Sequence, residues 1–272
     1  MTLQGAIREI TCGSPLKSLM TRARWGPMWH TAGGLLGARG ETARFLGVRR
    51  SEVSGWLREL RGHPNPAEES RLRFRQTVGR DPNDRVRVLG PINEMLYLMI
   101  RASRPEIVVE TGVHYGFSSS YLLRALHDNG RGRMTSIDLP TTDPHGRVNA
   151  EGRIDMSTVG SIAEIGCAVP DRLRDRWELI LGPSEEHLPK LLQSLPPVDV
   201  FFHDSDHSRS VMLREYRTAW PTIRPGGLLL SDDVDWNDAF VTFQAEMGGT
   251  PFKWFGSEGK RGALRRPASS TP

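Results

Sequence analysis

Glu110-Thr111-Gly112-Val113-His114-Tyr115-Gly116-Phe117-Ser118 is the stretch that decides the fold of this 272-residue chain. It follows the apolar run Ile107-Val108-Val109, and it precedes residues 121–126, whose apolar side chains are spaced as on one face of a helix. The sequence therefore predicts a strand, a glycine-rich turn and a helix. In α/β proteins, such a unit brings the backbone N–H groups of the turn and of the helix N-terminus close to a nucleotide-like ligand.

The acid at the end of this strand indicates which ligand the turn binds. The carboxylate of Glu110 would repel a pyrophosphate, whereas it would attract a cationic amino-acid group. Gly112 and Gly116 do not have the G-x-G-x-x-G spacing of dinucleotide-binding turns. We therefore expect S-adenosylmethionine as the cofactor, and a dinucleotide-dependent oxidoreductase is the alternative. The residues expected to bind the cofactor here are Glu110, Gly112, Tyr115, Gly116 and Ser118.

Strands and helices alternate along the chain from Gly90 onward. Apolar runs such as 198–202 are almost uninterrupted, which is typical of a parallel sheet covered on both faces. Pro225-Gly226-Gly227 is expected to form the turn that leads into the last parallel strand. The predicted strands are 106–111, 134–139, 177–182, 198–204 and 227–232, and the predicted helices are 92–100, 118–128, 185–194, 208–220 and 236–246.

The end of the chain completes the predicted fold. Residues 251–255 and 262–265 predict two strands of an antiparallel hairpin with its turn at 256–259. The fold class is therefore α/β, with a Rossmann-like seven-stranded sheet that ends in an antiparallel hairpin. We expect a helical N-terminal segment, the sheet domain and a disordered tail. Their predicted bounds are 1–85, 86–266 and 267–272.

Acidic side chains follow several of the predicted strands, at the edge where parallel sheets bind their ligands. Asp138, about 20 to 30 residues after the glycine turn, is expected to accept hydrogen bonds from a ribose, although a turn aspartate would have the same spacing. Ser184 is expected beside the adenine, and it can also cap the helix that begins at Glu185. The acids at strand ends are Glu110, Asp138, Asp204, Asp232 and Asp233.

Asp204, Asp232 and Asp233 predict a site for a hard divalent cation such as Mg²⁺. Crowded carboxylates repel one another unless a cation offsets their charge, and carboxylate oxygens are preferred ligands of Mg²⁺. The cation would orient a substrate hydroxyl and lower its pKa. His207, whose ordinary pKa is about 6.5, is expected to act with Asp204 as the catalytic pair that removes the hydroxyl proton. His203 is expected to point to the other face of its strand.

Together these residues resemble the class I S-adenosylmethionine-dependent methyltransferases, and most of all the metal-dependent O-methyltransferases of the catechol, caffeoyl-CoA and macrolide-sugar types. The resemblance covers about residues 90–266, and Asp204-Ser205-Asp206-His207 followed by residues 225–233 is its most specific part. It implies that Asp204, Asp232 and Asp233 bind the metal and that His207 is the base, as in the macrolide-sugar enzymes.

One departure from the resemblance bears on the acceptor. Catechol and caffeoyl-CoA enzymes have Asp-Asn where this chain has Asp232-Asp233, and they place a lysine near the first acid. The difference favours a small hydroxylated acceptor such as a sugar or another natural product. An insertion at 141–165 has no clear counterpart, and we expect it to help shape the acceptor pocket.

The composition limits the remaining possibilities. A hydrophobic share of 38% and a net charge of +4 suit a folded globular protein. We expect no membrane partner, because no stretch approaches the roughly 18 apolar residues of a membrane span and the N-terminus lacks the apolar core of a signal peptide. Cys12 and Cys167 lie far apart, which predicts neither a disulfide framework nor a zinc site and favours a reducing cytoplasm.

A DNA-binding module is the alternative function for the N-terminal segment. Residues 42–57 match helix-turn-helix spacing through Ala43, Gly47 and Val53. Residues 1–75 carry 13 basic and 6 acidic side chains, a net charge of +7. We favour a helical cap or a homo-oligomer interface, because short motifs match by chance, and so we do not expect nucleic acid as a partner. The oligomeric state stays open.

Overall fold

The computed structural model of the chain describes most of the predicted sheet domain and part of the N-terminal segment. Among these residues, no helix is both long and apolar enough to cross a membrane. Residues 1–34 and most of the predicted tail, 269–272, lie outside the described part. The described residues are 35–82, 91–143, 145, 147–149, 151–152, 154–155, 158–248, 250–256 and 259–268.

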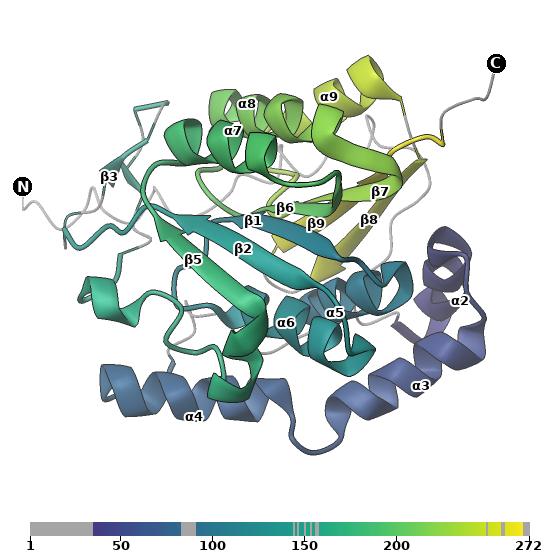
Figure 1. Cartoon of the computed structure of the whole chain (residues 1–272), viewed down its shortest axis with the longest axis horizontal. Helices are drawn as coiled ribbons and strands as arrows, with labels where there is room; N and C mark the ends of the chain where they lie inside the picture. The colour runs from purple at the N-terminus through teal and green to yellow at the C-terminus, as the bar shows by residue number, and fades with distance from the viewer. Residues whose placement is uncertain are drawn as a thin grey trace, which may run out of the picture.

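A seven-stranded sheet forms the centre of the molecule, in the order β5-β2-β1-β6-β7-β9-β8 (Figure 1). Strands β5, β2, β1, β6 and β7 are parallel, whereas β9 runs antiparallel to β7 and to β8. This confirms the predicted fold class, including the C-terminal hairpin. The strand bounds are β1 (Ile107–Thr111), β2 (Arg133–Asp138), β5 (Trp177–Leu181), β6 (Val198–His203), β7 (Ile223–Ser231), β8 (Thr250–Gly256) and β9 (Gly259–Arg265).

Helices cover both faces of the sheet, as the apolar strands require (Figure 1). Every residue of β6 is buried, because the strand lies in the middle of the sheet between two helical layers. The faces alternate along each strand: Val108 belongs to one core cluster and Val109 to the other. One layer is α5 (Pro91–Ser103) and α6 (Phe117–Asn129), and the other is α7 (Ser184–Ser194), α8 (Arg209–Ala219) and α9 (Ala239–Met247).

The described part of the N-terminal segment is helical and packs against the sheet domain. Its helices are α2 (Leu35–Leu46), α3 (Arg50–Arg61) and α4 (Pro66–Val78). Val53 and Leu57 of α3 are buried in the same core cluster as residues of α5 and of the sheet. Phe74 of α4 reaches the glycine turn, where its ring centroid lies 4.8 Å from that of Tyr115. The segment therefore shares the core of the sheet domain.

Two predicted boundaries are wrong. Pro225-Gly226-Gly227 lies within β7, which begins earlier than predicted, and is not a turn that precedes the strand. Gly226 has a φ of +78°, and the register between β6 and β7 shifts between Val198 and Val200. A local irregularity of this kind is where a sheet tolerates proline and glycine.

The second wrong boundary is the start of α9, which begins at Ala239 with Asp238 at its N-cap and not near Trp236. Neither Asp233 nor Asp235 is therefore the N-cap of this helix. The insertion at 141–165 holds a small antiparallel pair that we did not predict, β3 (Arg147–Val148) with β4 (Ile154–Asp155).

Candidate active site

The glycine turn between β1 and α6 packs against the end of β6. Gly112 has a φ of +84°, and a Cβ there would lie 2.0 Å from the backbone oxygen of Asp204. The N–H of Asp204 donates to the carbonyl oxygen of Thr111 at 2.7 Å. Gly116 also has a positive φ, +86°, and a Cβ there would lie 2.8 Å from the side chain of Val169. Only glycine fits these two positions, so the turn and Asp204 are held in one arrangement.

Asp138 fixes the same turn from the neighbouring strand β2. Its Oδ2 accepts hydrogen bonds from the N–H of Val113 at 2.6 Å and from that of His114 at 2.8 Å. These are the kind of hydrogen bonds that we expected it to accept from a ribose. The structure therefore places Asp138 beside the turn as predicted, with Oδ2 used by the protein backbone.

Glu110 lies beneath the turn and is fully buried. Its Oε2 accepts hydrogen bonds from the hydroxyls of Ser136 at 2.6 Å and Ser119 at 2.9 Å. Its Oε1 is buried without a hydrogen-bond partner among the described residues. Burial raises the pKa of this carboxyl to about 7 even though both serines oppose the shift. At neutral pH, Glu110 is therefore present in both its charged and its protonated form, and not only in the charged form that we predicted.

The other predicted cofactor residues lie in different surroundings. Ser118 donates its hydroxyl to Oδ2 of Asp204 at 3.2 Å, at the same edge of the sheet as the glycine turn. Tyr115 is buried between Phe74 and His114, so its side chain stabilises the outer side of the turn. Any contact of Tyr115 with a cofactor would use its backbone.

Ser184 has a different role from the predicted cap. Pro183 is the N-cap of α7, and Ser184 makes no capping hydrogen bond. Its hydroxyl donates to Oε1 of Glu215 on α8 at 2.5 Å. The prediction of a serine cap is therefore wrong, because this hydroxyl is drawn to a buried carboxylate on the neighbouring helix.

Glu215 is the centre of a buried hydrogen-bond network below the edge of the sheet. Oε1 also accepts from Ser205 at 2.8 Å, and Oε2 accepts from Thr111 at 2.5 Å and lies 2.7 Å from Nδ1 of His203. Burial favours the protonated form, but the charge and hydrogen bond of His203, with the hydroxyl hydrogen bonds, hold the pKa of Glu215 below its usual range. His203 thus faces Glu215 on α8, and its ring also lies 5.4 Å from that of His207.

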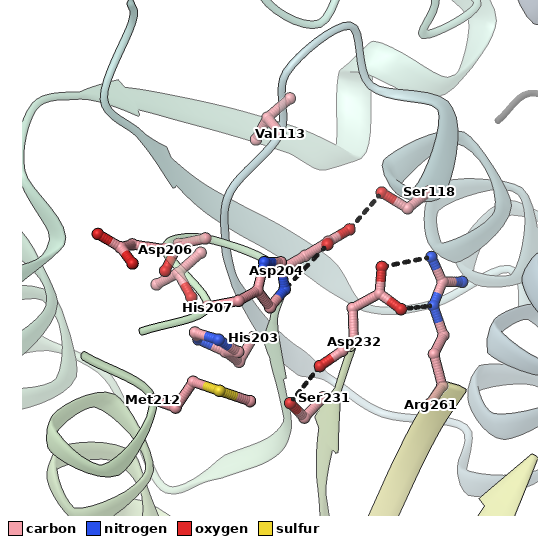
Figure 2. Close-up of polar contacts among 12 residues, drawn as sticks. Val113, Ser118, His203, Asp204, Asp206, His207, Met212, Ser231, Asp232 and Arg261 are labelled. Atoms are coloured by element: carbon pink, nitrogen blue, oxygen red, sulfur yellow. Dashed lines mark hydrogen bonds and ion pairs between the residues drawn. The ribbon is translucent and has the colours of Figure 1, made fainter. Parts of the chain in front are cut away.

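Asp204 and Asp232 lie together at the carboxyl edge of the sheet (Figure 2). Burial and the neighbouring charge of Asp232 raise the pKa of Asp204 well above its usual value. Burial would raise the pKa of Asp232 too, but the charge and hydrogen bonds of Arg261 hold it well below its usual range. Nε2 of His207 lies 3.9 Å from Oδ1 of Asp204, which places an imidazole beside the acid pair as predicted.

This group fits a divalent cation in chemistry and spacing. Asp204, His207 and Asp232 each offer a ligand atom, and these atoms lie within 4.8 Å of one another. The two carboxylates suit a hard ion such as Mg²⁺ or Mn²⁺, whereas an imidazole is a better ligand for softer ions such as Zn²⁺ or Fe²⁺. Asp233 is not part of this group in the described residues: it is buried, in a left-handed conformation with a φ of +43°. The structure therefore brings together Asp204 and Asp232, two of the three predicted metal ligands. His207, and not Asp233, completes the group.

Sequence reasoning missed three residues of the site. Arg261 reaches Asp232 from β9, Glu215 reaches His203 from α8, and Trp236 lies with its ring 5.3 Å from that of His207. None of the three is in a motif. Arg261 lies just before the predicted returning strand 262–265, so its place in β9 beside Asp232 could not be read from the sequence.

The comparisons with known proteins agree with this geometry. Residues 109–234 match a family model described as a methyltransferase domain. No curated protein sequence matches the chain. The matched segment includes the glycine turn, Asp138, Asp204, His207 and Asp232.

Solved structures with a similar fold include two methyltransferases and a further cofactor-bound protein. Cofactor-bound Rv0187 from MTB has a TM-score of 0.52 at 20% identity, over 76% of this chain and 94% of that one. The O-methyltransferase from Bacillus cereus in complex with SAH has a TM-score of 0.50 at 18% identity, over 75% and 92%. SAH-bound PaMTH1 from Podospora anserina has a TM-score of 0.51 at 15% identity, over 75% and 89%.

Proposed function

We propose that this chain, a methyltransferase with the class I fold, transfers the methyl group of S-adenosylmethionine to a hydroxyl oxygen of a small molecule. One observation carries the proposal: the glycine turn and the His207–Asp204 pair meet at one point. Gly112 touches the backbone of Asp204, and Ser118 donates to its carboxylate. A cofactor on the turn would therefore lie next to a base.

The cofactor part of the proposal rests on the shape of the turn. Gly112 and Gly116 allow close approach, Asp138 keeps the turn in place, and Glu110 lies beneath it as a neutral or negative partner for a cationic ligand. The similar structures from Bacillus cereus and Podospora anserina hold SAH, and Rv0187 is cofactor-bound, which supports S-adenosylmethionine here.

His207 is the proposed base. It lies largely buried beside Asp204 and Asp232, and the negative charge of Asp232, whose pKa is held low, stabilises an imidazolium. In the reaction, the acceptor hydroxyl gives its proton to His207, its oxygen forms a bond to the methyl carbon, and the carbon–sulfur bond breaks to leave S-adenosylhomocysteine. Positioning of the two reactants and the surrounding charges supply most of the acceleration.

We also propose that Asp204 and Asp232 would hold Mg²⁺ beside His207, which remains the base. When bound, Mg²⁺ supplies charge that orients the hydroxyl and lowers its pKa. The proximity of the three ligand atoms supports this.

The acceptor we propose is ring-shaped, a sugar or another natural product. Trp236 follows Asp232-Asp233 and is 58% exposed, with its ring 5.3 Å from that of His207. An exposed indole beside a base offers a flat apolar surface for a sugar ring or an aromatic ring. This supports the choice of acceptor class that the Asp232-Asp233 pair suggested.

Calorimetric titration with S-adenosylmethionine tests the cofactor, with Mg²⁺ in one series and EDTA in the other. Saturable binding in either series is expected, followed by transfer of a radiolabelled methyl group to members of a panel of sugars and phenols. No binding in either series would overturn the proposal. Transfer that is equal in EDTA and in Mg²⁺ would remove the metal from it while leaving the methyl transfer.

DNA binding is a second candidate function, because two helices joined by a short turn, α2 and α3, cover the residues of the predicted motif. Gly47, with a φ of +71°, separates α2 from α3, and Ala43 and Val53 are buried as the motif requires. A mobility-shift experiment with duplex DNA at low salt tests it. A shift that weakens as salt rises would support DNA binding, and no shift would exclude it.

A further inference from the structure

Arg261 forms a buried ion pair with one of the proposed metal ligands. In the sheet, Gly262 of β9 lies opposite Ser231 of β7, so the residues next to them, Arg261 and Asp232, are neighbours. Nε of Arg261 donates to Oδ1 of Asp232 at 2.8 Å, and Nη2 lies 3.3 Å from Oδ2 (Figure 2). Arg261 is only 5% exposed.

The guanidinium is held from other sides as well. Nη1 donates to Oδ1 of Asn93 on α5 at 2.6 Å, and the carbonyl oxygen of Ile92 lies 3.4 Å away. The centre of the guanidinium lies 5.5 Å from the ring of Phe202 on β6. A guanidinium does not lose its proton in a protein, so these contacts fix a permanent positive charge beside the acid pair.

This charge competes with a metal ion for Asp232. Arg261 uses both oxygens of that carboxylate, and a Mg²⁺ ion would need one of them at about 2.0 to 2.1 Å. The cation and the guanidinium would then repel each other in a buried place where water screens their charges weakly.

We infer that Arg261 sets the affinity of the Asp204–His207–Asp232 group for a divalent cation, by occupying Asp232 and opposing the charge of the ion. The inference rests on the metal part of the proposed function. In the metal-free protein, Arg261 balances the charge of Asp232. Metal binding requires that the carboxylate turn away from the guanidinium or share an oxygen with it.

Titration of the full-length protein with Mn²⁺, followed by electron paramagnetic resonance of the free ion, tests the inference. R261M is expected to bind Mn²⁺ at least about tenfold more tightly than the natural protein, because it removes the opposing charge. R261K keeps the charge and is expected to stay within about threefold of the natural protein. R265M is the matched control, since Arg265 lies on the same strand and bonds to Phe45 and Gly226 instead of an acid.

Two results would overturn the inference. One is an R261M affinity equal to or weaker than that of the natural protein, which would make Arg261 neutral or supportive. The other is a gain that persists in R261M/D232N, which would place the ion elsewhere. If circular dichroism shows that R261M does not fold, R261Q, which can still bond to Asn93, gives the same comparison. Methyl transfer is not the readout, so failure of the proposed reaction is separate from failure of this inference.

Discussion

Two groups of buried carboxylates lie close together in this protein and behave in opposite ways. Glu215, on α8, receives hydrogen bonds from three hydroxyls and faces His203, and its pKa is lowered. Asp204, at the edge of the sheet, receives one long hydrogen bond from Ser118 and faces a second acid, and its pKa is raised. The Glu215 side chain is 1% exposed and that of Asp204 is 19% exposed, so burial disfavours the charge of both and the difference in pKa comes mainly from their partners.

The comparison distinguishes a structural carboxylate from one that is suited to a ligand. At Glu215, the donors outweigh the cost of burial, and the result is a link between β1, β6, α7 and α8. At Asp204 the hydrogen-bond donors do not outweigh the cost of burying the charged carboxylate, so binding a cation or a proton would stabilise this site. Perturbed acids of this second kind gather at functional sites.

The largest effect is expected from His207→Ala, because it removes the proposed base from the acid edge. Turnover should fall by about 10²- to 10⁴-fold, while the affinity for S-adenosylmethionine stays nearly unchanged. Radiolabelled methyl transfer and calorimetry measure the two quantities. His127→Ala, an exposed histidine on α6, serves as the control. Unchanged turnover in His207→Ala would remove the base role.

Glu215→Ala should lower the free energy of unfolding of the protein. Removing this carboxylate leaves His203 and three hydroxyls without their acceptor, which costs on the order of 3 to 5 kcal/mol. Urea denaturation measures the loss. Glu246→Ala, which breaks the exposed ion pair with Arg217, should change stability little. Equal losses in the two variants would refute the contrast between the buried network and the surface.

Glu110→Gln should flatten the dependence of stability on pH. The carboxyl has a pKa of about 7 in the folded protein, above the value of about 4.3 expected for an unfolded chain, so the folded state binds the extra proton between these values. The contribution of Glu110 to the free energy of unfolding is therefore largest below pH 4. It falls as the pH rises through 7, by roughly 2 to 4 kcal/mol in total. Urea midpoints at pH 5 and pH 8 measure it; the same fall in both proteins would contradict the prediction.

Asp204→Asn should have the smallest effect on stability, and in the stabilising direction. Because the folded pKa of Asp204 is raised, its ionisation costs stability as pH increases, and the amide removes that cost. We expect a gain of up to about 1 kcal/mol at pH 8 and none at pH 4. Thermal unfolding of metal-free protein at the two pH values checks this. A loss of stability at pH 8 would show that the ionised acid is satisfied in the fold.

Much of the fold followed from local patterns. Apolar runs located the strands because both faces of the sheet are covered, and the glycine turn identified the start of the site because two positive φ angles are needed there. Boundaries failed where tertiary contacts override local chemistry. Pro225-Gly226-Gly227 pairs within β7, and Ser184 turns its hydroxyl to Glu215 instead of capping α7.

The sequence by itself determined which acids follow the parallel strands, because the last residue of each strand can be read from the chain and parallel strands end at one edge of the sheet. Only the tertiary structure decided what each acid faces. Asp232 meets Arg261, 29 positions away, and Glu215 meets Thr111, 104 positions away. Those pairings depend on the register of β9 and on how α8 packs across the sheet. These pairings set the pKa of each acid. They therefore also decide which acid stabilises the fold and which is available to a ligand.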